Sequence, residues 1–190
     1  MSDQATTRTV DNRAVPAVGI WTIDPTHTTI AAVARHLMVT KVRGHFASFS
    51  GTINVAEDPK DSTVELTIDA TSISTGTADR DNHLRSADFL DVDTYPTLTF
   101  RSTSIEADGK KWRLTGDLTI RDITQPIVLD LQFLGVATDP WGNAKAAFEA
   151  STDLERKEWG LTWNVPLATG GVLVSDKFKI EIEAQAAPQQ

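Results

Sequence analysis

The fold is decided by residues 112–133, which read WRLTGDLTIRDITQPIVLDLQF. Apolar and polar side chains alternate on both sides of a short connection, Thr124-Gln125-Pro126. Alternation with a period of two puts one apolar face inward and one polar face into water. The stretch therefore predicts two antiparallel strands in a sheet that is solvated on one side.

The same alternation recurs over residues 64–70, 146–153 and 178–184. Turn-forming pairs such as Asp108-Gly109 and Gly170-Gly171 fall between the alternating runs. The pattern predicts about eight or nine strands, several of them about ten residues long or longer. Long strands expose long edges, and closure into a barrel hides those edges best. An all-β barrel is therefore expected, with a two-sheet sandwich as the alternative.

Residues 77–89 break the alternation and predict a short helix that begins at Thr77 or Asp79. The spacing predicts surface pairs between Asp79 and His83 and between residues 81 and 85, an aspartate and an arginine. Leu84 is expected to face inward. A helix this short must pack on the sheet or plug one end of the barrel.

The strand expected over residues 43–55 does not alternate cleanly, because Phe46 and Phe49 are three positions apart. A β-bulge near residues 47–48 would return both rings to the same face of the sheet. We therefore expect one bent strand here, of the kind that helps to close a barrel.

The chain has 190 residues, with 18 basic and 26 acidic side chains and a formal net charge of −8. This length suits one domain with a substantial core. The acidic balance argues against nucleic acid as a partner and against rest on an anionic membrane surface. The absence of cysteine excludes disulfides, thiolate metal sites and cysteine nucleophiles.

No stretch approaches the roughly 18 consecutive apolar residues that a membrane-spanning helix requires. Residues 1–18 mix charges and hydroxyls without an apolar core, so they are expected to be a flexible polar leader and not a secretory signal. The barrel domain is expected over residues 19–186, with a tail at 187–190. Cytoplasmic localisation is expected, or a periplasmic or secreted one if the N-terminus has been trimmed.

The sequence carries no motif of a catalytic centre. Its four histidines, at positions 27, 36, 45 and 83, show no tight metal-ligand spacing, and each is expected to be structural or at the surface. There is no G-x-S-x-G elbow and no glycine-rich loop that opens a helix after a strand. We therefore expect no enzyme, no catalytic residue, no metal and no cofactor.

Several positions on the inward face carry small residues, namely Ala70, Gly116, Ala146 and Ala150. Eight strands enclose a space that side chains can fill or that one small ligand can occupy. Small residues fit both cases, because a filled core also alternates large and small side chains. A filled core and an apolar lumen are therefore both open on this pattern.

Four stretches carry a family resemblance: WTIDPTH at 21–27, RHLMV at 35–39 leading to VRG at 42–44, RDNHLRSADF at 80–89 with Tyr95-Pro96, and GDLTI at 116–120 with TQP at 124–126. In order and spacing they resemble the YceI-like family of lipocalin-like proteins that bind polyisoprenoids. The resemblance covers residues 19–186. It implies an extended eight-stranded antiparallel barrel with one or two short helices, which holds one prenyl chain and has no catalytic residues.

This chain departs from the family pattern at Ala32 and Ala34, where the family usually carries a bulky aromatic and then a branched aliphatic residue. If both alanines face inward, the lumen is wider on that side. The ligand is then expected to be bulkier, branched or kinked, as an isoprenoid quinone is. Asp122 stands where glycine is common in the family turn, and aspartate tolerates a left-handed conformation better than most residues.

His27, His36 and His83 recur in the matching motifs, and each serves either the structure or the polar head of a ligand. His83 is expected to tie its helix to Asp79 or to a carbonyl of the sheet. Asp24 is expected to cap the turn at residues 25–26. Trp159 and Trp163 are expected at the rim of a mouth, because a buried indole N–H needs a partner.

These observations together predict non-catalytic binding, carriage or sequestration of a polyisoprenoid or another isoprenoid amphiphile in an apolar barrel lumen. The alternatives are an enzyme that uses the lumen as a substrate pocket and a filled barrel that acts as an interaction module. We expect no nucleic acid and no stable membrane insertion, and we leave open transient membrane contact and a monomer or a homodimer. The residues expected to bind the ligand are Ile30, Ala32, Ala34, His36, Phe46, Phe49, Leu66, Ile68, Leu98, Phe100, Leu118, Ile127, Leu129, Phe133, Phe148 and Trp163.

Overall fold

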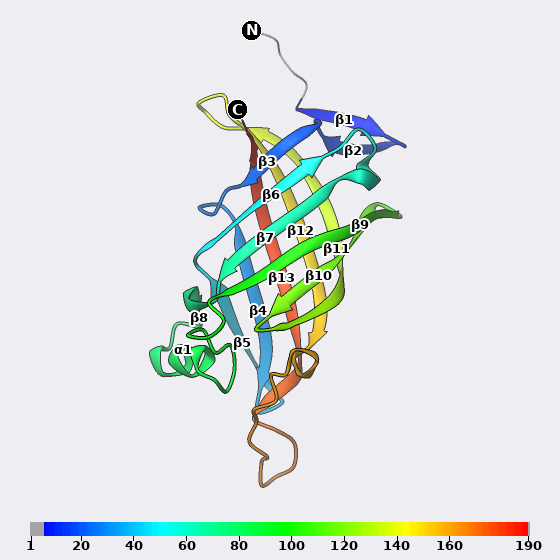
Figure 1. The fold of residues 1–190 in the computed structure, drawn as a ribbon. Helices are drawn as coiled ribbons and strands as arrows, with labels where there is room; N and C mark the ends of the chain where they lie inside the picture. Colours follow the sequence, from blue (N-terminus) through cyan, green and yellow to red (C-terminus); the bar gives the residue numbers. More distant parts are fainter. Residues whose placement is uncertain (1–5, 190) are drawn as a thin grey trace.

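Strands close into an eight-stranded antiparallel barrel in the computed structural model, which describes residues 6–189 (Figure 1). The order around the barrel is β3, β6, β7, β9, β10, β11, β12, β13 and then β3 again. The predicted all-β barrel is confirmed, and the sandwich alternative is wrong. The barrel strands are β3 (Gly19–Ile23), β6 (Phe49–Val55), β7 (Thr63–Asp69), β9 (Thr97–Asp108), β10 (Lys111–Ile120), β11 (Ile123–Thr138), β12 (Ala144–Glu155) and β13 (Val174–Pro188).

The pairing of β10 with β11 shows why alternation predicts this wall. Leu114 lies opposite Leu129, and both side chains are buried on the inner face. The neighbouring residues Asp117 and Asp130 are exposed on the outer face. One register therefore brings the alternating apolar positions of both strands, Trp112, Leu114, Leu118, Ile127, Leu129 and Leu131, to the same side of the sheet.

A second piece of sheet extends the wall beside β13. β13 pairs with β3 only over its last residues, 186–188, and with β4 (Thr29–His36) along most of its length. β4 pairs in turn with β5 (Thr40–Phe46), and β5 pairs with the short β8 (Ile73–Ser74). This extension runs to the lower end of the molecule in Figure 1.

The prediction of a single bent strand over residues 43–55 is wrong. The chain forms two strands instead, because residues 47–48 are held in a tight connection between β5 and β6. The amide of Ala47 donates to the carbonyl of Ser72 at 3.2 Å, and the carbonyl of Ser48 accepts from the amide of Asp69 at 2.9 Å. These bonds to a neighbouring 3-10 turn, η2 (Ala70–Ser72), end β5 and start β6.

The lower end of the barrel carries most of the helical parts of the chain. The helix α1 (Ala78–Arg85) lies there, as expected, with Thr77 as its N-cap residue and Leu84 packed against the core. The 3-10 turn η3 (Arg156–Trp159) and the segment 160–173 lie at the same end (Figure 1). The 3-10 turn η1 (Pro59–Asp61), which follows β6, lies instead at the upper end (Figure 1).

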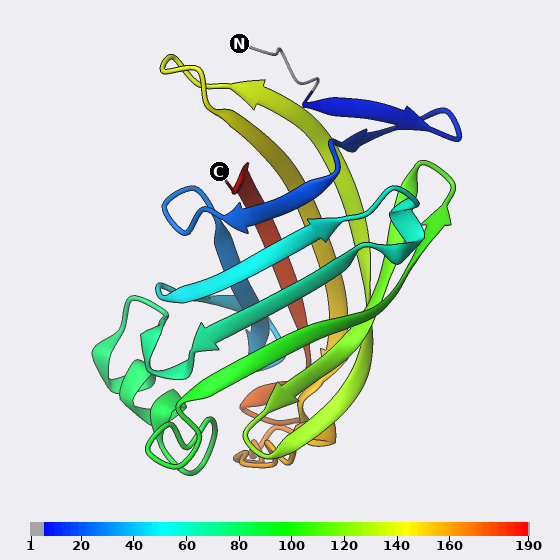
Figure 2. The ribbon, with the colours of Figure 1, turned by 45° about the horizontal axis from the view of Figure 1, so that its top comes forward.

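The upper end carries a β-hairpin where the sequence suggested a flexible leader. Residues 7–10 form β1 (Thr7–Val10), which pairs with β2 (Arg13–Pro16), and Val15 is buried (Figure 2). The Arg8 guanidinium donates to the carbonyls of Ala56 and Glu57, which fixes the hairpin to the barrel. The expectation for residues 1–18 is therefore wrong within the hairpin, and residues 1–5 lie outside the described part of the chain.

The barrel also extends further toward the C-terminus than the expected end at residue 186. β13 runs through Pro188, which lies opposite Trp21 of β3, and the amide of Gln189 donates to the carbonyl of Ile20 at 2.8 Å. The expected tail at 187–190 is thus largely part of the sheet, and Gln190 lies outside the described residues. Both β1 and the end of β13 lie at the upper end of the barrel (Figure 1).

Candidate ligand-binding cavity

A cavity of about 650 Å³ occupies the inside of the barrel. Its volume falls in the range of about 300–1,000 Å³ that is typical of small-ligand sites. The lumen is therefore hollow, and the filled-core alternative is wrong. Every residue expected to bind a ligand lies on the cavity wall except Phe49: Ile30, Ala32, Ala34, His36, Phe46, Leu66, Ile68, Leu98, Phe100, Leu118, Ile127, Leu129, Phe133, Phe148 and Trp163.

Phe49 is buried but does not line the cavity. It is the first residue of β6, directly after the connection that replaces the expected bulge. Its ring joins the apolar core cluster, where it lies opposite Ile68 of β7. The assignment of Phe49 to the lumen followed from the bulge, so both errors have one cause.

Small residues widen the cavity at some inward positions but not at others. Ala32, Ala34 and Ala150 lie on its wall, so their missing side-chain volume enlarges the space. Gly116 does not, because the Phe100 ring lies where a side chain at this position would stand. The remaining two expected positions, residues 70 and 146, are packed inside apolar clusters away from the cavity.

Polar side chains of the cavity wall gather at its lower end. His36 comes from the end of β4, and Asp79, Arg80 and His83 come from α1. Arg80 is held in place by Thr75, whose hydroxyl accepts from the guanidinium Nε at 2.7 Å. The cavity is therefore apolar along its length and polar where α1 borders it.

The contacts of His83 differ from those expected. Its Nε2 lies 2.8 Å from the carboxylate of Asp88, a residue beyond the helix, in place of the expected partner, Asp79 or a sheet carbonyl. The imidazole ring packs edge-on against Phe89 and Trp163, with centroid distances of 5.1 and 4.5 Å. His83 thus joins the α1 region to the segment that follows η3.

The expected pair between Asp81 and Arg85 is also replaced by other contacts. Asp81 is buried and accepts from the hydroxyl and the amide of Thr75, at 2.6 and 2.7 Å. The Thr75 hydroxyl bond is the largest cause that holds the pKa of Asp81 below its usual value. Arg85 donates to the carbonyls of Thr71 and Ile73 at 2.7 Å, so both side chains fix α1 to η2 and β8.

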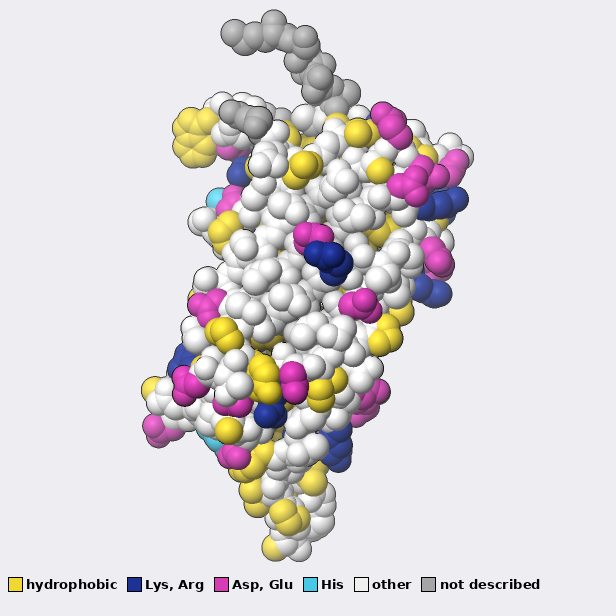
Figure 3. Space-filling model, in the orientation of Figure 1, with side chains coloured by type: hydrophobic (Ala, Val, Ile, Leu, Met, Phe, Trp, Pro, Cys, Tyr) yellow, Lys and Arg dark blue, Asp and Glu magenta, His cyan; other side chains and the backbone are white. Residues whose placement is uncertain are grey.

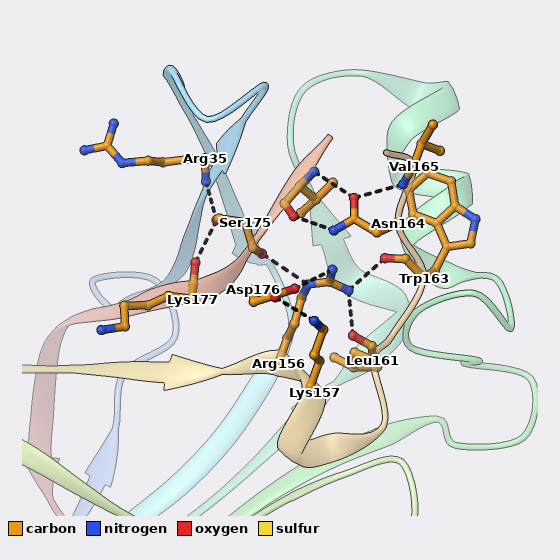
Figure 4. Close-up of polar contacts among 11 residues, drawn as sticks. Arg35, Arg156, Lys157, Leu161, Trp163, Asn164, Val165, Ser175, Asp176 and Lys177 are labelled. Atoms are coloured by element: carbon orange, nitrogen blue, oxygen red, sulfur yellow. Dashed lines mark hydrogen bonds and ion pairs between the residues drawn. The ribbon is translucent and has the colours of Figure 1, made fainter. Parts of the chain in front are cut away.

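A buried arginine, which the sequence did not single out, organises the lower end (Figure 4). Arg156 is 4% exposed and donates to the carbonyls of Leu161, Trp163 and Ser175 at 2.6, 2.8 and 3.1 Å. Its remaining nitrogen lies 3.0 Å from the carboxylate of Asp176. One guanidinium thus hydrogen-bonds backbone carbonyls near both ends of the segment 160–175.

The two tryptophans expected at a rim occupy different environments. Trp159 is fully buried in the core, and its indole N–H donates to the carbonyl of Leu118 at 3.0 Å. Its expected rim position is therefore wrong, because β10 supplies the partner that the buried N–H needs. Trp163 is half-buried on the cavity wall beside His83.

Asp24 caps the turn after β3 as expected, since it accepts from the amide of Thr26 at 3.0 Å. Its other oxygen lies 2.9 Å from Nζ of Lys145 and 3.0 Å from Nδ1 of His27. These contacts, the Lys145 hydrogen bond first, hold the pKa of Asp24 far below its usual value against a smaller effect of burial. The carboxylate therefore joins the β3–β4 connection to β12.

A pH dependence of stability follows from this contact. Because the pKa of Asp24 is lower in the folded than in the unfolded chain, the stabilisation is complete above about pH 4 and is lost as pH falls further. We expect Asp24→Asn to lower the free energy of unfolding by about 1–2 kcal/mol at pH 7, with a smaller difference at pH 3. Urea unfolding at both pH values measures this, with Asp117→Asn on the exposed face of β10 as the control. An equal loss at both pH values would contradict it.

Residues 6–189 lack two kinds of feature. No group of three or more His, Asp or Glu side chains is placed to hold a metal ion. No helix in the same range has both the length and the hydropathy needed to cross a membrane.

Comparison with known proteins gives one consistent match. The family described as YceI-like domain matches residues 21–186. Protein YceI of Shigella flexneri is 41% identical over 128 residues, which is 67% of this chain and 67% of that protein. A crystal structure of the Campylobacter jejuni YCEI protein has a TM-score of 0.70 and 29% identity, and it covers 82% of this chain and 90% of its own.

A more distant neighbour shares the architecture. It is a polyisoprenoid binding domain from Saccharophagus degradans, described as implicated in plant cell wall breakdown, with a TM-score of 0.66. The alignment covers 91% of this chain and 100% of that domain, at 16% identity. A likeness at this identity shows the common barrel fold.

Proposed function

We propose that this chain, which belongs to the YceI-like family, binds an isoprenoid amphiphile and carries or sequesters it in the barrel. The observation that carries the proposal is the hollow apolar lumen of about 650 Å³. The polyisoprenoid binding described for the domain from Saccharophagus degradans is extended to this chain as part of the proposal. The physical basis is the burial of an apolar tail away from water.

The energy of tail burial suits a carrier. Burial of each methylene-sized group contributes about 0.8 kcal/mol, so an isoprene unit of five carbons contributes very roughly 4 kcal/mol before costs. Association costs of about 4–15 kcal/mol oppose this gain. A few buried units are therefore enough for useful affinity, and a longer tail exchanges slowly with water.

The polar lower end gives the ligand an orientation. The side chains of His36, His83 and Arg80 border the cavity there, whereas the rest of the wall is almost entirely apolar. An amphiphile that places its tail along the barrel axis would meet these groups with its polar head. Because Ala34 and His36 lie on the same face of β4, the widened part of the lumen adjoins the head. This favours a head of some bulk, such as a quinone.

Extraction of the purified protein with organic solvent, followed by mass spectrometry, tests the proposal directly. We expect a prenyl lipid in stoichiometric amount, or uptake of one when delipidated protein is incubated with isoprenoid alcohols and quinones. Failure of the delipidated, folded protein to take up any of them would contradict the proposal. A linear fatty acid of similar carbon number is the matched control ligand.

We also propose that the protein holds the ligand without changing it chemically. The same mass spectra test this, because a carrier returns the ligand at its original mass after long incubation. A product of altered mass, lost on His36→Ala, would instead support an enzyme that uses the lumen as its substrate pocket. His36 is chosen because it is a titratable side chain on the cavity wall.

A further inference from the structure

Large apolar side chains are exposed together at the lowest point of the molecule, and we call Leu37, Met38, Val39 and Val165 the apolar tip. Their exposed fractions are 45, 51, 72 and 43%. They come from the turn between β4 and β5 and from the segment 164–173, which form the lower end of Figure 1. Figure 3 shows hydrophobic side chains gathered on this end of the surface.

The two segments of the apolar tip support each other. The amide of Leu37 donates to the carbonyl of Leu173 at 2.8 Å, and the Met38 side chain lies against Gly171. Asn164 braces the base of the segment, because its side chain accepts from the amides of Val165 and Val174 (Figure 4). The exposed apolar side chains are therefore held outward by an ordered backbone.

The turn itself is unfavourable for the residues that it carries. Leu37 and Met38 have φ values of 52° and 62°, in the left-handed region where bulky residues are rare. A turn with positive φ at both central residues strongly prefers Asn-Gly or Asp-Gly. Here an exposed turn has apolar residues in that conformation, which neither solubility nor turn stability explains.

Charge is distributed so that the apolar tip can meet an anionic surface. The sequence has no charged residue from Gly160 through Ser175, although the chain carries 26 acidic side chains. Arg35 and Lys41 lie opposite each other at the base of the β4–β5 turn, and both are exposed. An apolar surface flanked by basic side chains is the pattern of proteins that bind the surface of anionic bilayers. The two segments of the apolar tip therefore carry no acidic side chain that would oppose such contact.

The apolar tip adjoins the lower end of the cavity. His36 and Leu173 line the cavity. Leu37, which follows His36, and Gly171–Val172, which precede Leu173, belong to the two segments that carry the tip. We propose that the apolar tip docks on a phospholipid bilayer that contains anionic lipid and places the polar end of the cavity at the membrane surface. Docking is independent of the ligand, whereas exchange of an isoprenoid at that contact rests on the proposed function.

Sedimentation with phosphatidylcholine vesicles, with and without phosphatidylglycerol, tests the docking. We expect binding to the anionic vesicles that weakens as salt rises, and a loss of at least about tenfold in the double variant V39E/V165E. Trp141→Glu is the matched control, because Trp141 is 84% exposed at the turn between β11 and β12, at the upper end. Binding that survives V39E/V165E, or that is lost in Trp141→Glu, would overturn the proposal.

A labelling experiment tests the same contact without introducing charge. The chain has no cysteine, so Val39→Cys and Trp141→Cys each accept one environment-sensitive dye. We expect the emission of the dye at position 39, and not at position 141, to shift to the blue when anionic vesicles are added. Absence of that blue shift would contradict docking. If the unaltered protein self-associates and V39E/V165E does not, as measured by ultracentrifugation, the patch would be assigned to copies of this chain instead.

The two proposals fail separately. If V39E/V165E no longer binds vesicles but still yields the extracted lipid, the docking surface and the carrier function are both supported. If the unaltered protein binds vesicles yet takes up no isoprenoid, docking stands and the proposed ligand is wrong. If it takes up isoprenoid without binding vesicles, the proposed function stands and the docking proposal is wrong.

Discussion

Ala34→Phe is expected to weaken the binding of a bulky-headed isoprenoid quinone by at least about tenfold and to leave a slim polyprenol much less affected. Ala34 lies on the cavity wall beside His36, in the part of the lumen that its small side chain widens. A phenyl ring there would occupy space that a head group needs. Titration calorimetry or quenching of tryptophan fluorescence with both ligands measures the change.

Val33→Phe is the matched control for this variant. Val33 is the neighbouring residue on β4, is half-buried, and does not line the cavity. It receives the same phenyl ring on the opposite face of the strand. Equal affinities of Ala34→Phe and Val33→Phe for the quinone would show that the widened lumen does not select the ligand. Urea unfolding of both variants separates lost affinity from lost stability, since added bulk in a packed site costs about 1–3 kcal/mol.

Arg156→Met is expected to lower the free energy of unfolding by about 3 kcal/mol. The variant keeps the length of the side chain but leaves the buried carbonyls of Leu161 and Trp163 without their donor. Denaturant unfolding measures the loss, and hydrogen exchange is expected to rise selectively over residues 160–175. The effect reaches the cavity as well, because Trp163 lies on its wall.

Lys157→Met supplies the comparison for Arg156→Met. Both basic side chains contact the carboxylate of Asp176, but the Lys157 side chain is 56% exposed and that of Arg156 is 5% exposed. A surface ion pair contributes about 0–1 kcal/mol, so Lys157→Met is expected to be nearly neutral. Equal losses in the two variants would contradict the central role of the buried guanidinium.

The barrel wall could be predicted from sequence because period-two alternation and closure act on many residues at once. Leu114, Leu129 and the alternate residues of their strands face the lumen for the same reason. The sequence pattern therefore predicted almost every expected residue of the cavity wall. Phe49 was misplaced because a bulge and a tight turn both explain the spacing of Phe46 and Phe49. The bonds of residues 47–48 to η2 distinguish the two, and these partners are distant in sequence.

Contacts between distant segments also explain the other errors. Arg156 follows β12 in a run of charged residues that looks solvent-exposed, and its three carbonyl partners come from later in the chain. The helix spacing offered His83 the carboxylate of Asp79, but the chain beyond α1 folds back and presents Asp88. The N-terminal hairpin did leave a local signal, because Asp11-Asn12 is a pair that tolerates the left-handed conformation that it adopts.

The placement of β1 and the end of β13 at one end of the barrel fixes how the protein can be handled (Figures 1 and 2). A fusion partner or an affinity handle joined before β1 or after β13 is attached on the side away from α1. Immobilised on a sensor chip through either one, the barrel stands with His36 and His83 facing the flowing solution. Oriented attachment of this kind allows vesicles and amphiphiles to be injected over the same captured molecules.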